Sequence, residues 1–147
     1  MSQKGNYTNL ASEYHVYSIL HRLGVSAAIT QGNKKAVDII VERGGKALTI
    51  DVKGLQSTGD FIVNNPAQDS NHYIAFVYYK KGEFNNPHAI PEVFIVPSKD
   101  LEKPFKELDG KPLTVTRSGV VNVAYASLKK LSAKYQDNWQ VFKETLG

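Results

Sequence analysis

The sequence predicts an α/β or α+β domain in which helices cover a mixed β-sheet. Three stretches lead to this prediction. Residues 9–23 have apolar side chains at helical spacing, two β-branched runs flank Gly44-Gly45, and residues 73–79 form a nearly continuous apolar strand. A chain of 147 residues suits one domain with one core. We therefore expect residues 1–147 to form a single domain.

The composition excludes several classes of function. The chain contains no cysteine, which rules out disulfides, thiolate zinc sites and cysteine nucleophiles. No apolar run approaches the ~18 residues that span a bilayer, and the start lacks the hydrophobic segment of a signal peptide. We expect a cytoplasmic protein that does not bind membranes. The net charge of +4 is compatible with a polyanionic partner without indicating one.

The first helix is expected to follow a loose arm at residues 1–8 and to end before Gly24. Glu13 falls in the middle of its apolar arc. A carboxylate at the centre of a core-facing stripe is costly unless it is paired or bound to a metal ion. Alternatively, Glu13 interacts with the helix N-terminal dipole and reaches water. The apolar arc consists of Leu10, Val16, Tyr17, Leu20 and Leu23.

The two runs around Gly44-Gly45 predict a β-hairpin, because this pair tolerates the positive φ angles of a short hairpin turn. Counting outward from the turn places Ile39 opposite Ile50 and Asp38 opposite Asp51. Side chains alternate between the two faces of a strand, so one face of the hairpin is entirely apolar and belongs against a core. That face carries Val37, Ile39, Val41, Leu48, Ile50 and Val52.

The other face of the hairpin brings charged groups together. Asp38 and Asp51 would lie opposite each other with Cβ atoms about 5 Å apart, a destabilising arrangement that a divalent cation would reverse. Lys53 would lie on the same face, roughly 7 Å further along the strand. The alternative is an ordinary solvent-facing surface in which Asp51 pairs with Lys53. A three-residue turn would also shift the register by one and separate the two acids.

The rest of the chain supplies strands, loops and a second helix. We expect strands at 25–30, 73–79 and 92–96, a helical turn at 99–101, a hairpin from 113–116 and 120–123, and a helix from 127 to 146 in which Asp137 caps a second segment. The connection 54–71 is long for an irregular segment. The four histidines show no metal-ligand spacing, so we expect surface or helix positions for them. The final helix has its apolar stripe at Leu128, Leu131, Tyr135, Trp139 and Phe142.

Oxygen ligands beside an ammonium group suit Mg²⁺, with Mn²⁺ as a substitute, rather than zinc. The sequence has no glycine-rich phosphate loop and no nucleophile-elbow motif. These parts predict metal-assisted hydrolysis, for which phosphodiesters are suitable substrates.

A helix with a core-facing acid, an Asp, and then Asp-x-Lys on the paired strand resembles the PD-(D/E)xK nuclease superfamily. The likeness is greatest to small members such as Holliday-junction resolvases and homing endonucleases. It implies a restriction-endonuclease-like core, a mixed sheet flanked by helices. It also implies Mg²⁺ ligation by Asp38, Asp51 and the Val52 carbonyl, activation of water by Lys53, and a second cation or its water at Glu13. The usual proline before the first Asp is replaced by Val37.

The resemblance further implies a Mg²⁺-dependent endonuclease that hydrolyses DNA. One site per chain suggests a homodimer or higher oligomer, because cutting two strands needs two sites. One alternative is a non-catalytic module on the same fold that binds nucleic acid or protein. Another is a structural domain whose acids merely pair with Lys53. The residues expected near the DNA backbone are Lys34, Lys35, Gln56, Lys80 and Lys81.

Overall fold

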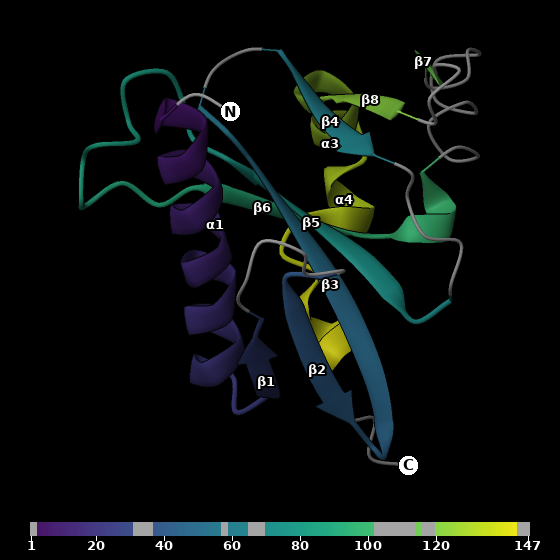
Figure 1. Ribbon diagram of the computed structural model, residues 1–147. Coiled ribbons are helices and arrows are strands. Elements are labelled where there is room, and N and C mark those ends of the chain that lie inside the picture. The colour runs from purple at the N-terminus through teal and green to yellow at the C-terminus, as the bar shows by residue number, and fades with distance from the viewer. Residues whose placement is uncertain are drawn as a thin grey trace.

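The computed structural model describes residues 3–30, 37–56, 59–64, 70–101, 114–115 and 120–143 (Figure 1). The chain begins with α1 (Gln3–Arg22) and β1 (Ser26–Ile29), followed by β2 (Ile39–Arg43), β3 (Lys46–Leu55) and β4 (Asp60–Asn64). Next come β5 (His72–Tyr78), β6 (Glu92–Pro97) and the 3₁₀ turn η1 (Ser98–Asp100). The last elements are β7 (Thr114–Val115), β8 (Val120–Ala124), α3 (Tyr125–Lys130), α4 (Ser132–Tyr135) and η2 (Trp139–Phe142).

The main sheet is mixed, as the sequence predicted. Its strand order is β1-β2-β3-β5-β6, with β5 parallel to β3 and antiparallel to β6. The β2–β3 hairpin has the expected register, with Ile39 opposite Ile50. Gly44 and Gly45 form its turn with φ angles of 55° and 81°, conformations that glycine adopts without strain. Local sequence therefore determined this hairpin.

One face of the main sheet packs against α1. Val16 and Leu20 from the helix are fully buried against the apolar face of the hairpin, including Ile50 and Val52. Phe142 from η2 joins the same core. The apolar side chains at alternate positions of β2 and β3 explain this layer, because they all leave the sheet on one side.

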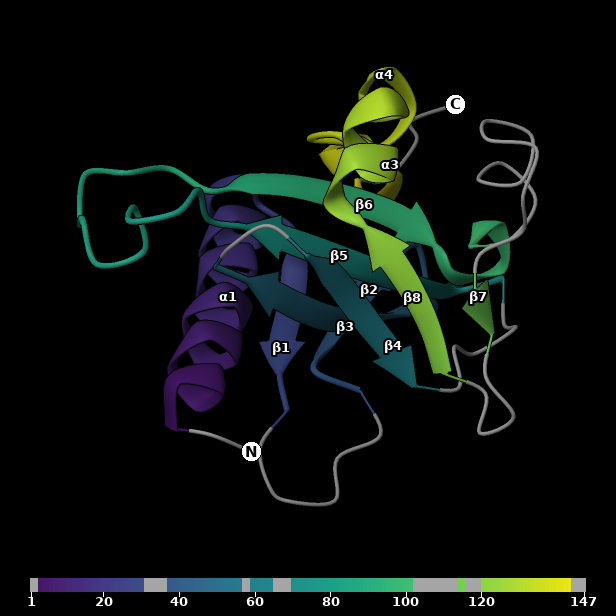
Figure 2. The ribbon, with the colours of Figure 1, turned by 90° about the horizontal axis from the view of Figure 1, so that it is seen from above.

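A second, three-stranded sheet covers the opposite face; its β7–β8 hairpin was predicted from the sequence, whereas the addition of β4 was not. Its order is β4-β8-β7, and β4 and β8 run side by side (Figure 2). Phe61 of β4 packs edge-to-face on Phe76 of β5, with ring centroids 5.0 Å apart. The expected irregular connection 54–71 thus contains a strand with alternating buried residues. Its partner strand lies some sixty positions further along the chain, so no local pattern announces the pairing.

The first helix begins earlier than expected, and it buries only part of the expected apolar arc. It starts at Gln3, and Leu10 is 52% exposed, although we had expected this residue in the core. The buried side chains near its start are instead Thr8, Ser12 and Glu13. Of these, the small residues Thr8 and Ser12 lie close to Gly54, so the helix approaches β3 more closely here than a leucine would allow.

The expected helix at 127–146 is broken into α3, α4 and η2. Asp137 does not cap a helix. It has a φ of 54°, and its backbone N–H donates to the Val93 carbonyl. The chain thereby turns across β6, so Tyr135 enters the core beneath the second sheet while Phe142 enters the core beneath α1.

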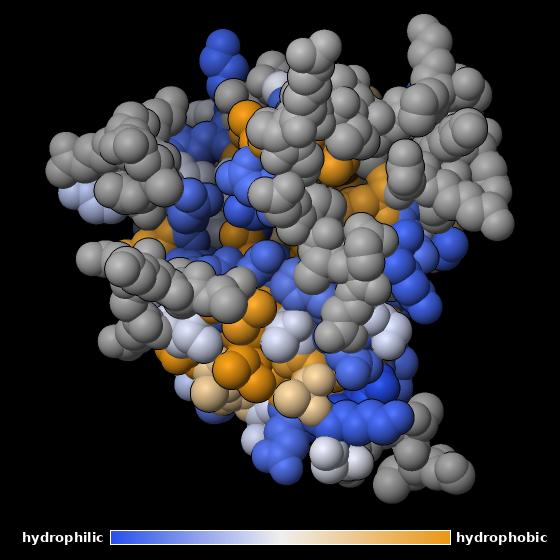
Figure 3. All heavy atoms as spheres, turned by 45° about the vertical axis from the view of Figure 1, so that its right-hand side comes forward, coloured by the Kyte–Doolittle hydropathy of each residue, from blue (hydrophilic) through white to orange (hydrophobic). Residues whose placement is uncertain are grey.

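The exposed surface is mixed in character. Hydrophobic residues gather in a patch bordered by hydrophilic ones on the face drawn in Figure 3. The exposed apolar residues include Ile40 on β2 and Ile62 on β4. Among the helices of the described residues, none is long and apolar enough to cross a membrane.

Candidate functional site

The candidate site lies where β2 begins and β3 continues past it. Lys53 and Asp51 point to the same face of the sheet as their β5 partners Phe76 and Ile74, the face opposite α1. The pairing of β2 with β3 extends only to Ile39 and Ile50, although β3 runs on to Leu55. The edge of β3 beyond this point is therefore available to groups other than a β2 backbone.

Asp38 occupies the first position beyond β2. Its backbone N–H donates to the Ile50 carbonyl at 3.0 Å, and its Oδ2 accepts a hydrogen bond from the Val52 N–H at 2.8 Å. The Thr30 hydroxyl contacts the carbonyls of Val37 and Asp38, which fixes the backbone here. Because the N–H and C=O of one strand residue point the same way, the Val52 carbonyl also faces Asp38.

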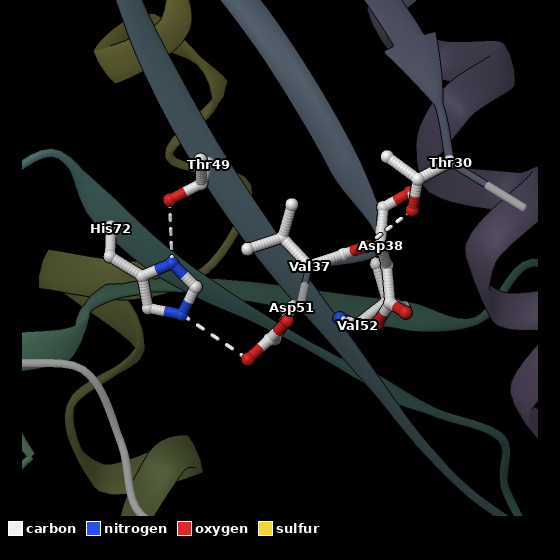
Figure 4. A network of polar contacts seen from close by, with 7 residues as sticks. All are labelled: Thr30, Val37, Asp38, Thr49, Asp51, Val52 and His72. Carbon is white, nitrogen blue, oxygen red and sulfur yellow. Dashed lines mark hydrogen bonds and ion pairs between the residues drawn. The ribbon is translucent and has the colours of Figure 1, made fainter. Parts of the chain in front are cut away.

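The Asp51 carboxylate is directed toward β5 (Figure 4). Its Oδ2 lies 3.3 Å from Nε2 of His72, and Nδ1 of His72 lies 2.7 Å from Oγ1 of Thr49. The contact between Asp51 and His72 is close, but it lacks the geometry of an aligned hydrogen bond. The β3 backbone thus engages the Asp38 carboxylate on the side of β2, whereas the Asp51 carboxylate leans from β3 toward β5.

His72 is a correction to the expectation that all four histidines take surface or helix positions. It is the first residue of β5, directly beside Thr49 in the pairing of the two strands, and it is 3% exposed. The alternation of side chains along β5 could have identified His72 as a neighbour of the site. His72 stands two residues before Ile74 and therefore shares the face on which Asp51 lies.

Glu13 is buried, as its position in the predicted arc required, with 6% exposure. It comes from α1 and therefore from the side of the sheet opposite Asp51 and Lys53. Within the described part of the chain, no three His, Cys, Asp or Glu side chains are grouped closely enough to hold one metal ion. The structure therefore brings Asp38 and Asp51 to one segment of β3, but does not assemble them with Glu13 into a set of three ligands.

The basic and amide residues expected near DNA do not all lie at one place in the structure. Lys80 and Lys81 are exposed and follow the end of β5, which is the same end of the sheet as Lys53 because β3 and β5 are parallel. Gln56 donates from Nε2 to the Thr8 hydroxyl and ties the end of β3 to α1. Lys34 and Lys35 lie outside the described residues.

Comparison with known proteins identifies the fold. No protein-family model matches the sequence, and no curated protein matches it. The structure is similar to that of Hjc, a Holliday junction resolvase from the archaeal hyperthermophile Archaeoglobus fulgidus, with a TM-score of 0.51 and 13% identity over 95% of this chain and 98% of that chain. The bacterial homing endonuclease I-Ssp6803I matches with a TM-score of 0.48 and 13% identity over 95% and 90% of the two chains.

The fold is similar to that of the Holliday junction resolvase, which agrees with the mixed sheet flanked by helices that the sequence predicted. The assignment rests on the first of the two structures, which has the higher TM-score. At this identity the likeness concerns the fold, and the chemistry of this chain has to be argued from its own residues.

Proposed function

We propose that the protein is a Mg²⁺-dependent endonuclease that hydrolyses DNA phosphodiester bonds. The observation that carries the proposal is the docking of Asp38 on the Val52 N–H, in the middle of the sequence Asp51-Val52-Lys53. This contact brings the Asp38 carboxylate, at the point where β2 begins, to the segment of β3 that carries Asp51, the Val52 carbonyl and Lys53. The structural similarity to a Holliday junction resolvase supports the same class of substrate.

The chemistry of these groups fits a hard divalent cation. Carboxylate and carbonyl oxygens are the ligands that Mg²⁺ and Mn²⁺ prefer. Asp38, Asp51 and the Val52 carbonyl would hold the ion. Its contribution would be to neutralise charge on the scissile phosphate and to lower the pKa of water. Glu13, on the α1 side, would bind a second cation or a metal-bound water.

The side chains of the protein would perform the remaining tasks. Lys53 is partly exposed on the same face as Asp51, so its ammonium group can orient a water molecule against the phosphate and stabilise the developing negative charge. Lys80 and Lys81 would contact the backbone of the nucleic acid beside the site, together with Lys34, Lys35 and Gln56. Such contacts hold the register of the duplex without reading its sequence.

Assembly is part of the proposal. One chain carries one hairpin of this kind, whereas a cut through both strands or across a four-way junction requires two. We therefore propose a homodimer or higher oligomer that acts in the cytoplasm. Sedimentation equilibrium of the purified protein tests this point directly.

Two observations favour a second candidate function, a non-catalytic module that binds nucleic acid or protein. Asp51 leans toward His72, and the described residues hold no group of three metal-binding side chains. A protein that had kept the fold without the chemistry would show these features. The two candidates differ in metal affinity, because only the nuclease requires it.

The deciding experiment titrates Mg²⁺ and Mn²⁺ into the protein by calorimetry and measures cleavage of supercoiled plasmid and of a four-way DNA junction. The wild-type protein should bind metal and cut. The Asp51→Asn variant should neither bind metal nor cut DNA, whereas the Lys53→Ala variant should bind metal but not cut DNA. Asp137→Asn is the matched control, because asparagine tolerates the positive φ of that exposed position. A wild-type protein that takes up no metal and cuts neither DNA would refute the nuclease and leave the binding module.

A further inference from the structure

A buried histidine lies beside the candidate site and has no role in the function proposed above. We propose that His72 is a positioning residue that holds one oxygen of the Asp51 carboxylate, so that the other oxygen is presented to the divalent cation. This inference rests on the proposed metal-dependent function and deepens it. It concerns the residues of the chain itself and can be tested without measuring cleavage.

The imidazole is held in place from both strands. Thr49 and His72 are direct partners in the parallel pairing of β3 and β5, and the Thr49 N–H donates to the Asn71 carbonyl at 2.9 Å. The His72 side chain is 4% exposed. A ring enclosed in this way cannot turn freely, so the direction of its two nitrogens is determined by the sheet.

The hydrogen-bond partners select one arrangement of the ring. If the Thr49 hydroxyl donates to Nδ1 across their 2.7 Å separation, the proton of a neutral imidazole resides on Nε2. That N–H then faces Oδ2 of Asp51 at 3.3 Å. In the opposite tautomer two lone pairs would face each other, which is unfavourable. The Thr49 hydroxyl therefore donates to His72, and His72 in turn directs its N–H to the Asp51 carboxylate.

These contacts give the two carboxylate oxygens of Asp51 different roles. Oδ2 is directed to His72, so the role of metal ligand falls to Oδ1. Asp38 shows the same division, because its Oδ2 is engaged by the Val52 N–H. Groups that hydrogen-bond to a ligating carboxylate orient it, and their removal typically weakens metal binding about 10–100-fold.

A purely structural role for His72 would be to fasten β5 to β3. That role would affect stability in the absence of metal, whereas a positioning role affects the affinity for metal. Three substitutions separate the two. His72→Gln retains an N–H near the position of Nε2, His72→Leu fills the space without a donor, and Thr49→Val removes the hydroxyl while keeping its shape.

The readout is the dissociation constant of Mn²⁺, measured by electron paramagnetic resonance at fixed pH, with unfolding in EDTA recorded for each variant. We expect His72→Leu to weaken Mn²⁺ binding about 10–100-fold, as loss of an outer partner does. His72→Gln should stay within a few-fold of wild type, and Thr49→Val should fall between them.

The outcomes distinguish this inference from the proposed function. If the wild-type protein fails to bind Mn²⁺, the proposed function itself is refuted. If the wild type binds and His72→Leu binds equally well, only the role of His72 is overturned. Equal losses in His72→Gln and His72→Leu would also overturn it, because the donor would then be irrelevant. If His72→Leu does not fold, unchanged affinity in Thr49→Val has the same meaning.

Discussion

The close approach of α1 to β3 at Gly54 gives a sharp prediction about stability. A Cβ atom at this position would lie 2.3 Å from Oγ of Ser12 and 2.9 Å from the backbone carbonyl oxygen of Thr8. Both distances are too short for a real contact. The second one involves backbone and cannot be relieved by a rotamer change. Gly54→Ala therefore forces the helix away from the strand that carries Asp51 and Lys53.

The expected loss of stability can be worked out from the steric clash. Inserting a methyl group into a packed interface costs about 1–3 kcal/mol. For a chain of this length, each kcal/mol shifts the melting temperature by about 2–4 °C. Gly54→Ala should therefore lower the melting temperature by about 2–12 °C and reduce the free energy of unfolding measured in urea, with no change in m-value.

A double-mutant cycle with Ser12→Ala isolates the cause. Ser12→Ala alone should destabilise the protein by about 0.5–1.5 kcal/mol, because its hydroxyl donates to the Thr8 carbonyl at 2.6 Å. Combined with Gly54→Ala it should recover part of the loss, since the shorter of the two clashes disappears. Additive losses in the double variant, or a Gly54→Ala protein as stable as wild type, would refute the close packing described here.

Two further predictions concern β6 and η2. Burial raises the pKa of the Glu92 carboxyl, but hydrogen bonds from Lys129 and Tyr125 outweigh it and hold the pKa below its ordinary value of 4.5. Its contribution to stability should be complete above pH 4.5 and lost as the pH falls through the lower folded pKa, so urea unfolding of wild type and Glu92→Gln should converge in acid. Phe142 is 1% exposed and packs on Tyr73, so Phe142→Ala should lower the free energy of unfolding by about 3–5 kcal/mol. Ile90 is 86% exposed, so the control Ile90→Ala should change it by less than about 0.5 kcal/mol. Equal urea midpoints for these two variants would contradict the closure of the α1 core by η2.

The hairpin shows how far local sequence can reach. A Gly-Gly turn between two β-branched runs determines both the register and the apolar face, since each depends only on counting residues from the turn. The burial of Glu13 and the end of α1 before Gly24 were also predictable, because helical spacing and a glycine stop are local signals. These local signals also predicted the correct fold class and placed two acids and a lysine on the hairpin.

The tertiary structure decided what the charged groups of that motif contact. Asp38 turns to the Val52 N–H and Asp51 leans toward His72, and the second of these partners lies on a strand twenty-one residues further along. The sheet formed by β4 and β8, and the turn at Asp137 that sends Tyr135 and Phe142 into different cores, likewise join distant segments. The sequence by itself determined the hairpin and the identity of its acids. Only the folded chain determined that His72 lies beside Asp51, that β4 pairs with β8 and that Asp137 crosses β6, because these contacts depend on packing between segments that share no local pattern.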